Sequence, residues 1–122
     1  MKKIVLGLTL LLSLTSFANS KEDMIEVGLM SRFPILTDDV TTVNVHEFDV
    51  DLDHEKIEIK LELKGVGRKE EFEKIDKSKL ETLMADMAKY AQNESGKNLP
   101  VHIEVEVDRD MIPDETLYKN IF

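Results

Sequence analysis

The groups in this chain that could do chemistry are mostly carboxylates, and the densest run is Asp49–Asp53, with an acid at every second residue. A calcium-binding EF-hand loop opens in the same way. Counted from Asp49, however, position six is His54 and position twelve is Lys60, where that loop needs a glycine and a bidentate glutamate. The run is therefore predicted to be the solvated side of a β-strand, with a weak surface cation site as the alternative.

The three histidines, His46, His54 and His102, are the other candidate ligands or bases. No two of them have the spacing of a helical zinc motif, and there is no cysteine to complete one. We therefore assign no metal ligand and no cofactor. His46 and Glu47 stand out as a candidate site, because they lie where the alternation of a predicted strand slips by one residue, and such irregularities often occur near functional sites.

Covalent catalysis is poorly supplied in this sequence. There is no cysteine and no Gly-x-Ser-x-Gly elbow around a serine nucleophile. Gly65 and Gly67 are not followed by the further glycine and the helix start of a phosphate-binding loop. Paired carboxylates are frequent, but among 25 acidic residues such pairs arise by chance. No catalytic residue is assigned.

The first twenty residues have the order of a secretory signal peptide. Two lysines precede an apolar run over residues 4–14, and small residues follow at Ser16, Ala18 and Ser20. The apolar run is shorter than the roughly 20 residues that span a bilayer, and no cysteine is present to carry a lipid. We expect cleavage after Ala18 or Ser20 and a mature chain, without an integral membrane span, that is periplasmic or secreted.

Charge and length limit the mature chain, residues 21–122, to a single small acidic domain. Residues 1–20 hold two of the 16 basic residues and none of the 25 acidic ones, so their removal changes the formal net charge from −9 to −11. This charge argues against binding to nucleic acid or anionic lipid and favours cationic partners. Without disulfides, the domain must be held together by packing.

Residues 48–63 predict a β-hairpin, because apolar and charged residues alternate on both sides of a polar turn. Folding the chain about residues 53–56 places three apolar pairs opposite one another: Phe48 and Leu61, Val50 and Ile59, Leu52 and Ile57. All six side chains then share one face of the sheet, and the charged residues share the other.

Upstream of this hairpin the alternation changes phase. Val43 and Val45 share one phase, and Phe48 has the opposite one. An extra residue in a strand produces such a slip, so we expect a β-bulge at His46–Glu47 that leaves Val45 opposite Leu63 on the apolar face.

A helix and a third strand complete the predicted core. Over Leu80–Ala91 apolar residues recur every three or four positions, which predicts an amphipathic helix. Asp76 and Ser78 compete to cap its start, and Gly96 is suited to end it in the left-handed conformation. Residues 101–107 alternate apolar and polar, which predicts the third strand.

The remaining segments are less regular. Residues 21–36 are predicted to form a short helix that Pro34 closes. Residues 68–74, with Phe72 as the single apolar side chain, are expected to be a linker or a twisted strand extension, and residues 110–122 a short edge strand or a packed tail. Together the elements predict an α+β fold, with a small antiparallel or mixed sheet and one helix packed on one of its faces.

On this basis we expect a non-enzymatic binding or interaction module. Either the edge of the third strand pairs with a partner's strand, or the wet face of the sheet, with Asp49, Asp51, Glu104 and Glu106, meets a cationic protein or peptide. The alternatives are a small metal-dependent or hydrolytic enzyme, which would use His46 and the Asp49–Asp53 run, and a carrier of a small apolar ligand bound between helix and sheet.

Overall fold

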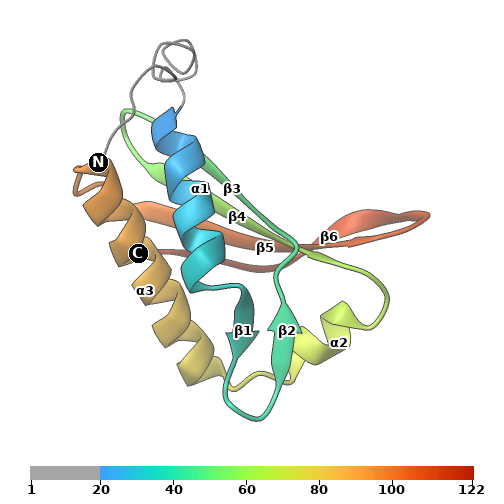
Figure 1. The fold of residues 1–122 in the computed structure, drawn as a ribbon. Helices are drawn as coiled ribbons and strands as arrows, with labels where there is room; N and C mark the ends of the chain where they lie inside the picture. Colours follow the sequence, from blue (N-terminus) through green and yellow to red (C-terminus); the bar gives the residue numbers. More distant parts are fainter. Residues whose placement is uncertain (1–19) are drawn as a thin grey trace, which may run out of the picture.

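A computed structural model describes residues 20–122, so the predicted signal peptide lies, except for Ser20, outside the described residues. The main layer is a four-stranded sheet made of β3 (Glu47–Leu52), β4 (Ile57–Lys64), β5 (Val101–Arg109) and β6 (Ile112–Ile121), in that order. The central pair, β4 and β5, runs parallel, and both outer pairs run antiparallel. The predicted α+β class with a mixed sheet is confirmed (Figure 1).

Two helices lie on the same face of this sheet, because the short helix predicted over residues 21–36 packs there beside the one packed helix that was expected (Figure 1). They are α1 (Ser20–Arg32), which covers β3, and α3 (Lys77–Ser95). Together with the short helix α2 (Arg68–Glu73), α3 forms the crossover that a parallel pair of strands requires. None of the helices between Ser20 and Phe122 has the length and apolar character needed to cross a bilayer.

The predicted hairpin is confirmed in its register, since Phe48, Val50 and Leu52 lie opposite Leu61, Ile59 and Ile57 in β3 and β4. Alternation then divides the sheet into two faces. The face toward the helices is closed by apolar side chains that are at most 4% exposed: Phe48, Val50, Ile57, Ile59, Leu61, Leu63, Val101, Ile103, Val105 and Val107. The opposite face, which we call the outer face, carries the intervening polar and charged residues.

The phase slip at His46–Glu47 has the hydrogen bonding of the predicted β-bulge: the N–H of His46 donates to the carbonyl of Glu62 at 2.8 Å, and Glu47 pairs with the same residue, so two residues of one strand lie opposite one of the other. The expected pairing of Val45 with Leu63 is not in the register, which begins at Glu47, and the N–H of Val45 donates to the carbonyl of Pro34 at 2.9 Å. The preceding residues belong to a separate two-stranded sheet of β1 (Ile35–Thr37) and β2 (Thr42–Asn44), which the sequence analysis did not predict. The phase slip therefore lies where the chain passes from one sheet to the other, and Val45 is buried as expected.

The helix α3 is closed at both ends by the residues that the sequence offered. Asp76 is the N-cap, in preference to Ser78, and its carboxylate accepts the N–H of Lys79. Gly96 ends the helix with a φ of 74°. The carboxylate of the buried Asp38, at the turn between β1 and β2, accepts the N–H of Asp76 and so joins the small sheet to the start of α3.

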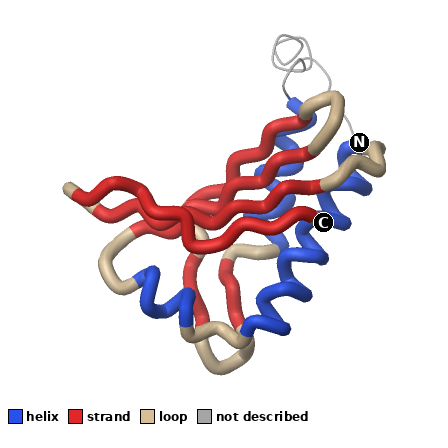
Figure 2. Tube along the Cα trace, turned by 180° about the vertical axis from the view of Figure 1, so that it is seen from behind, coloured by secondary structure: helices blue, strands red, loops and turns tan. Residues whose placement is uncertain are grey.

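Two further expectations are corrected by the structure. Residues 68–73 form α2 rather than a linker or strand extension, and its one apolar side chain, Phe72, is buried in the core. The third strand, β5, lies inside the sheet between β4 and β6, so it offers no free edge. The edge is β6, which residues 110–122 supply, and the β5–β6 hairpin projects beyond the helical layer (Figure 2).

Candidate functional site

The outer face of the sheet is the surface to which the sequence assigned four acidic residues. Figure 2, seen from behind, shows the strands in front and the long helices beyond them, so α1 and α3 leave this side uncovered. Asp49 and Asp51 of β3 and Glu104 and Glu106 of β5 all lie on it, because each alternates with a buried neighbour. The strand register decides which charges then become neighbours.

Across the middle of the outer face the charges alternate in sign. The register places side by side, from β3 to β6, the residues Asp49, Lys60, Glu104 and Lys119. Directly opposed unlike charges favour strand pairing. This row therefore neutralises itself, and Asp49 and Glu104 are not free to act as an isolated acidic pair.

The next row is different, and we call it the glutamate row: Glu47, Glu62 and Glu106. These three lie directly opposite one another on β3, β4 and β5, where like charges destabilise strand pairing. The ammonium of Lys60 approaches Glu106 at 3.6 Å. Among the described residues no ion pair reaches Glu47 or Glu62, so the row keeps most of its negative charge.

Two carboxylates of the row, Glu62 and Glu106, hold their protons more tightly than free glutamates do. Burial, together with the charges of Asp108 and Glu47, raises the pKa of Glu62. Burial and the hydrogen bond with Glu104 raise the pKa of Glu106, although Lys60 opposes the shift. Each shift means that the ionised form is disfavoured at this place. A cation that entered the row would relieve that unfavourable free energy.

A hollow of about 220 Å³ lies over the glutamate row, with Asp114 of β6 added to its wall. A larger hollow of about 670 Å³ lies over the neighbouring rows and reaches Glu22 of α1, with His102, Lys60 and Lys119 among its lining residues. The outer face is thus concave rather than flat. The smaller hollow is acidic almost throughout, whereas the larger one carries both signs of charge.

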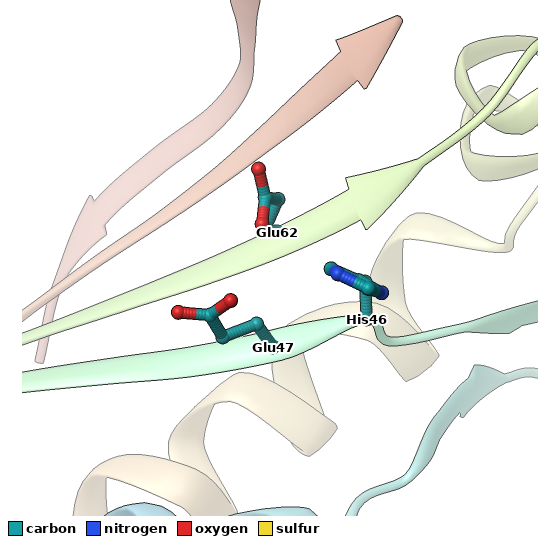
Figure 3. Close-up of side chains that lie close together, drawn as sticks. All are labelled: His46, Glu47 and Glu62. Atoms are coloured by element: carbon teal, nitrogen blue, oxygen red, sulfur yellow. The ribbon is translucent and has the colours of Figure 1, made fainter.

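The pair His46 and Glu47, which the sequence singled out, lies at the end of this row and gains a third member, Glu62 (Figure 3). A nitrogen of His46 and one carboxylate oxygen of each glutamate all lie within 4.8 Å of one another. The N–H of His46 donates to the carbonyl of Glu62 at 2.8 Å, which fixes the two backbones relative to each other. Glu62 was missed, although the predicted hairpin register already places it opposite Glu47.

The remaining candidates are not brought together. Asp53 lies in the turn after β3, where its carboxylate accepts the N–H of His54, and this separates it from the strand residues of its run. His102 lies opposite Glu58 in another row. Among residues 20–122 the group of His46, Glu47 and Glu62 is the one set of three ligand side chains close enough for a metal ion.

Both edges of the sheet are protected against a further strand. Along β3, carboxylates from α1 occupy outward backbone N–H groups, with Glu26 accepting from Val50 and Glu22 from Leu52, each at 2.8 Å. Along β6, the side chain of Asn120 accepts the N–H of Ile121, and the pairing with β5 shifts register twice. Irregular and covered edges resist strand addition. The uncovered surface is the outer face.

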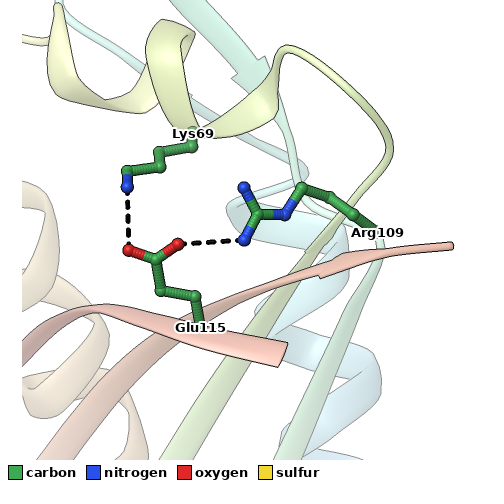
Figure 4. Close-up of polar contacts among 3 residues, drawn as sticks. All are labelled: Lys69, Arg109 and Glu115. Atoms are coloured by element: carbon green, nitrogen blue, oxygen red, sulfur yellow. Dashed lines mark hydrogen bonds and ion pairs between the residues drawn. The ribbon is translucent and has the colours of Figure 1, made fainter. Parts of the chain in front are cut away.

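A three-residue ion-pair network steadies the projecting hairpin (Figure 4). Glu115 of β6 contacts Lys69 of α2 at 2.8 Å and Arg109 of β5 at 2.9 Å. The hydrogen bond from Lys69, followed by that from Arg109 and the charges of both cations, holds the pKa of Glu115 below its ordinary value. This network uses two of the basic groups nearest the hairpin, so they do not neutralise the glutamate row.

The geometry therefore presents an acidic, concave sheet surface as the candidate site, with a histidine at one end. Such a surface can bind positively charged groups, because its carboxylates lie close together and repel one another when ionised. Comparison of the chain with protein-family models, with curated proteins and with solved structures finds no match.

Proposed function

We propose that this protein is an exported, non-enzymatic binding module that captures a cationic protein or peptide on the outer face of its sheet. The observation that carries the proposal is the glutamate row, in which Glu47, Glu62 and Glu106 lie directly opposite one another without a full set of basic partners. Like charges that lie directly opposite one another destabilise the pairing of strands, so the row does not serve the stability of the sheet. Partner binding supplies a reason to keep them.

The spacing of the row suits basic side chains. Adjacent strands lie about 4.8 Å apart, so the ends of the row are separated by roughly 10 Å. A lysine or arginine can lie between two neighbouring glutamates and donate to both, and arginine can do so in a planar, bidentate manner. A peptide with several basic residues would thus neutralise Glu47, Glu62 and Glu106 together.

The protected edges favour this surface over strand pairing, which the sequence left as an equal possibility. Glu22 and Glu26 cover N–H groups of β3, and Asn120 covers one at β6. An apolar carrier is less well supported, because core residues of α3 and of the sheet, such as Met84 and Leu61, are 0% exposed. The outer face therefore remains the best-supported contact surface.

The proposal is tested by binding a lysine- and arginine-rich peptide to the purified protein, measured by calorimetry at low and high salt. The triple variant Glu47→Gln, Glu62→Gln, Glu106→Gln should lose most of the affinity, and raised salt should weaken the binding of the unchanged protein. The matched control is Glu70→Gln, Asp86→Asn, Glu94→Gln, which changes net charge equally at exposed helix positions. Equal losses in both variants would contradict a specific face.

Export is a separate part of the proposal. It is supported by the order of charged, apolar and small residues over positions 1–20. Cell fractionation and N-terminal sequencing of the protein from a bacterial host should give a mature chain that begins at Asn19 or Lys21. A full-length chain recovered from the cytoplasm would contradict export without affecting the binding measurement.

A further inference from the structure

The end of the glutamate row differs from the rest of the outer face in the kind of atoms it offers. His46 contributes an imidazole nitrogen, and Glu47 and Glu62 contribute carboxylate oxygens, within 4.8 Å of one another (Figure 3). Oxygen donors alone are the ligands that calcium and magnesium prefer. A mixed nitrogen and oxygen set suits zinc and its neighbours among the divalent transition metals.

We propose that His46, Glu47 and Glu62 form a binding site for a divalent transition-metal ion of the zinc class. The site goes beyond the proposed capture of a cationic partner and does not depend on it. Two of its three residues are adjacent in the chain, and the third lies directly opposite on the neighbouring strand. Three protein ligands leave a fourth position for water, as in open zinc sites.

The backbone holds these residues in place while their side chains keep room to move. His46 donates its backbone N–H to the carbonyl of Glu62 at 2.8 Å, and Glu47 begins the paired part of β3. Ligand atoms around a zinc ion lie roughly 3.3 Å apart, given metal distances near 2.0–2.2 Å. The three ligand atoms, which lie within 4.8 Å of one another, would reach this separation through small rotations of the exposed side chains of His46 and Glu47.

Electrostatics favour a cation here over an empty site. Glu47 and Glu62 oppose each other with like charge, and within the described part of the chain neither forms an ion pair. Asp108 and Asp114 add further negative charge near Glu62. A bound divalent ion would replace this repulsion by attraction.

The test is zinc binding to the metal-free protein, followed by calorimetry and by competition with a colorimetric chelator. The unchanged protein should bind one equivalent of zinc, and more tightly than calcium or magnesium. His46→Gln and Glu62→Gln should each weaken zinc binding by at least about tenfold, since loss of even an outer partner of a ligand costs that much. The melting temperature should rise when zinc is added, because the ion binds the folded state.

Two matched variants make the outcome decisive. His102→Gln and Glu58→Gln remove the same kinds of group from the outer face, two rows away from Glu62 along β4, and they should leave zinc affinity unchanged. If His46→Gln binds zinc as tightly as His102→Gln, or if calcium and magnesium bind as tightly as zinc, the proposed site is wrong. Either result would leave the test with the basic peptide intact, so failure of the two proposals can be told apart.

Discussion

The carboxylate of Glu26 in α1 accepts the backbone N–H of Val50 in the edge strand β3 at 2.8 Å, and one helical turn earlier Glu22 does the same for Leu52. Two side chains thus take the place of a neighbouring strand. The apolar contacts of Ile25 and Leu29 hold α1 against the sheet, and the two glutamates close the edge beside it. The helix therefore has two roles, one in the core and one in preventing strand addition.

Opening this edge should make the protein self-associate. The double variant Glu22→Ala, Glu26→Ala frees the N–H groups of Val50 and Leu52 and should lower the free energy of unfolding by about 1–2 kcal/mol. Sedimentation velocity should then show dimers or larger species at concentrations where the unchanged protein is monodisperse. Asp23→Ala is the control, since this exposed acid on the same helix contacts neither N–H group. Unchanged sedimentation of the double variant would contradict the protective role.

The glutamate row should lower the stability of the folded protein while it favours binding of the basic peptide. Glu62→Lys gives the row the alternating charges of its neighbour, with a lysine between Glu47 and Glu106. We expect the free energy of unfolding to rise by about 1 kcal/mol in low salt, from cross-strand attraction. Binding of the basic peptide should fall in the same variant. Denaturant unfolding measures the first effect, and a less stable Glu62→Lys protein would contradict this account of the row.

Asp38 should contribute to the stability of the fold, and this contribution should be lost in strong acid. Its carboxylate accepts the N–H groups of Thr41, Asp76 and Val40, and these bonds lower its pKa to about 2. A lowered pKa stabilises the fold above the ordinary value near 3.8, and this contribution is lost as the pH falls toward 2. Asp38→Asn should lower the melting temperature by several degrees at pH 7 and flatten its decline between pH 4 and about pH 2. A parallel decline in both proteins would contradict this assignment.

Gly28 and Tyr90 should show coupled energetics. A Cβ added to Gly28 would stand 1.7 Å from the Tyr90 hydroxyl, and the Tyr90 ring also lies 4.8 Å from the Arg32 guanidinium. Gly28→Ala gains about 1 kcal/mol in helix propensity but must displace Tyr90. With Tyr90→Ala in the background, the same substitution should be stabilising. Unfolding of the four proteins in the cycle measures the coupling, and additive effects would contradict the contact.

Tyr118 should ionise at an unusually high pH, and its contribution to the stability of the fold should be lost in alkali. Burial and a 2.7 Å hydrogen bond to Glu81 raise its pKa to about 12. Because the unfolded chain releases this proton near pH 10, the contribution is present below pH 10 and declines as the pH rises toward 12. Ultraviolet titration of the unchanged protein and of Tyr118→Phe should differ by one tyrosine that ionises near pH 12. A difference curve centred near pH 10 would contradict the buried contact.

Several parts of the fold follow from the sequence because they depend on neighbours along the chain. The register of β3 with β4 follows from alternation about one short turn, the end of α3 follows from Gly96, and its start lies at Asp76, one of the two caps that the sequence offered. The acidic outer face follows too, since each charged residue alternates with a buried one. The hairpin register also brings Glu62 opposite Glu47, so most of the histidine site was within reach of local reasoning.

The tertiary structure decides which distant segments pair with one another. The periodicity of the sequence indicates which face of a sheet a residue lies on, but not which strand lies beside it. The parallel pairing of β4 with β5 completes the glutamate row with Glu106, and the addition of β6 turns the third strand from an edge into an interior strand. The separate sheet of β1 and β2 takes the residues that precede the phase slip at His46. Contacts between α1 and β3 place Glu22 and Glu26 on the edge, 30 and 24 residues away from their partners.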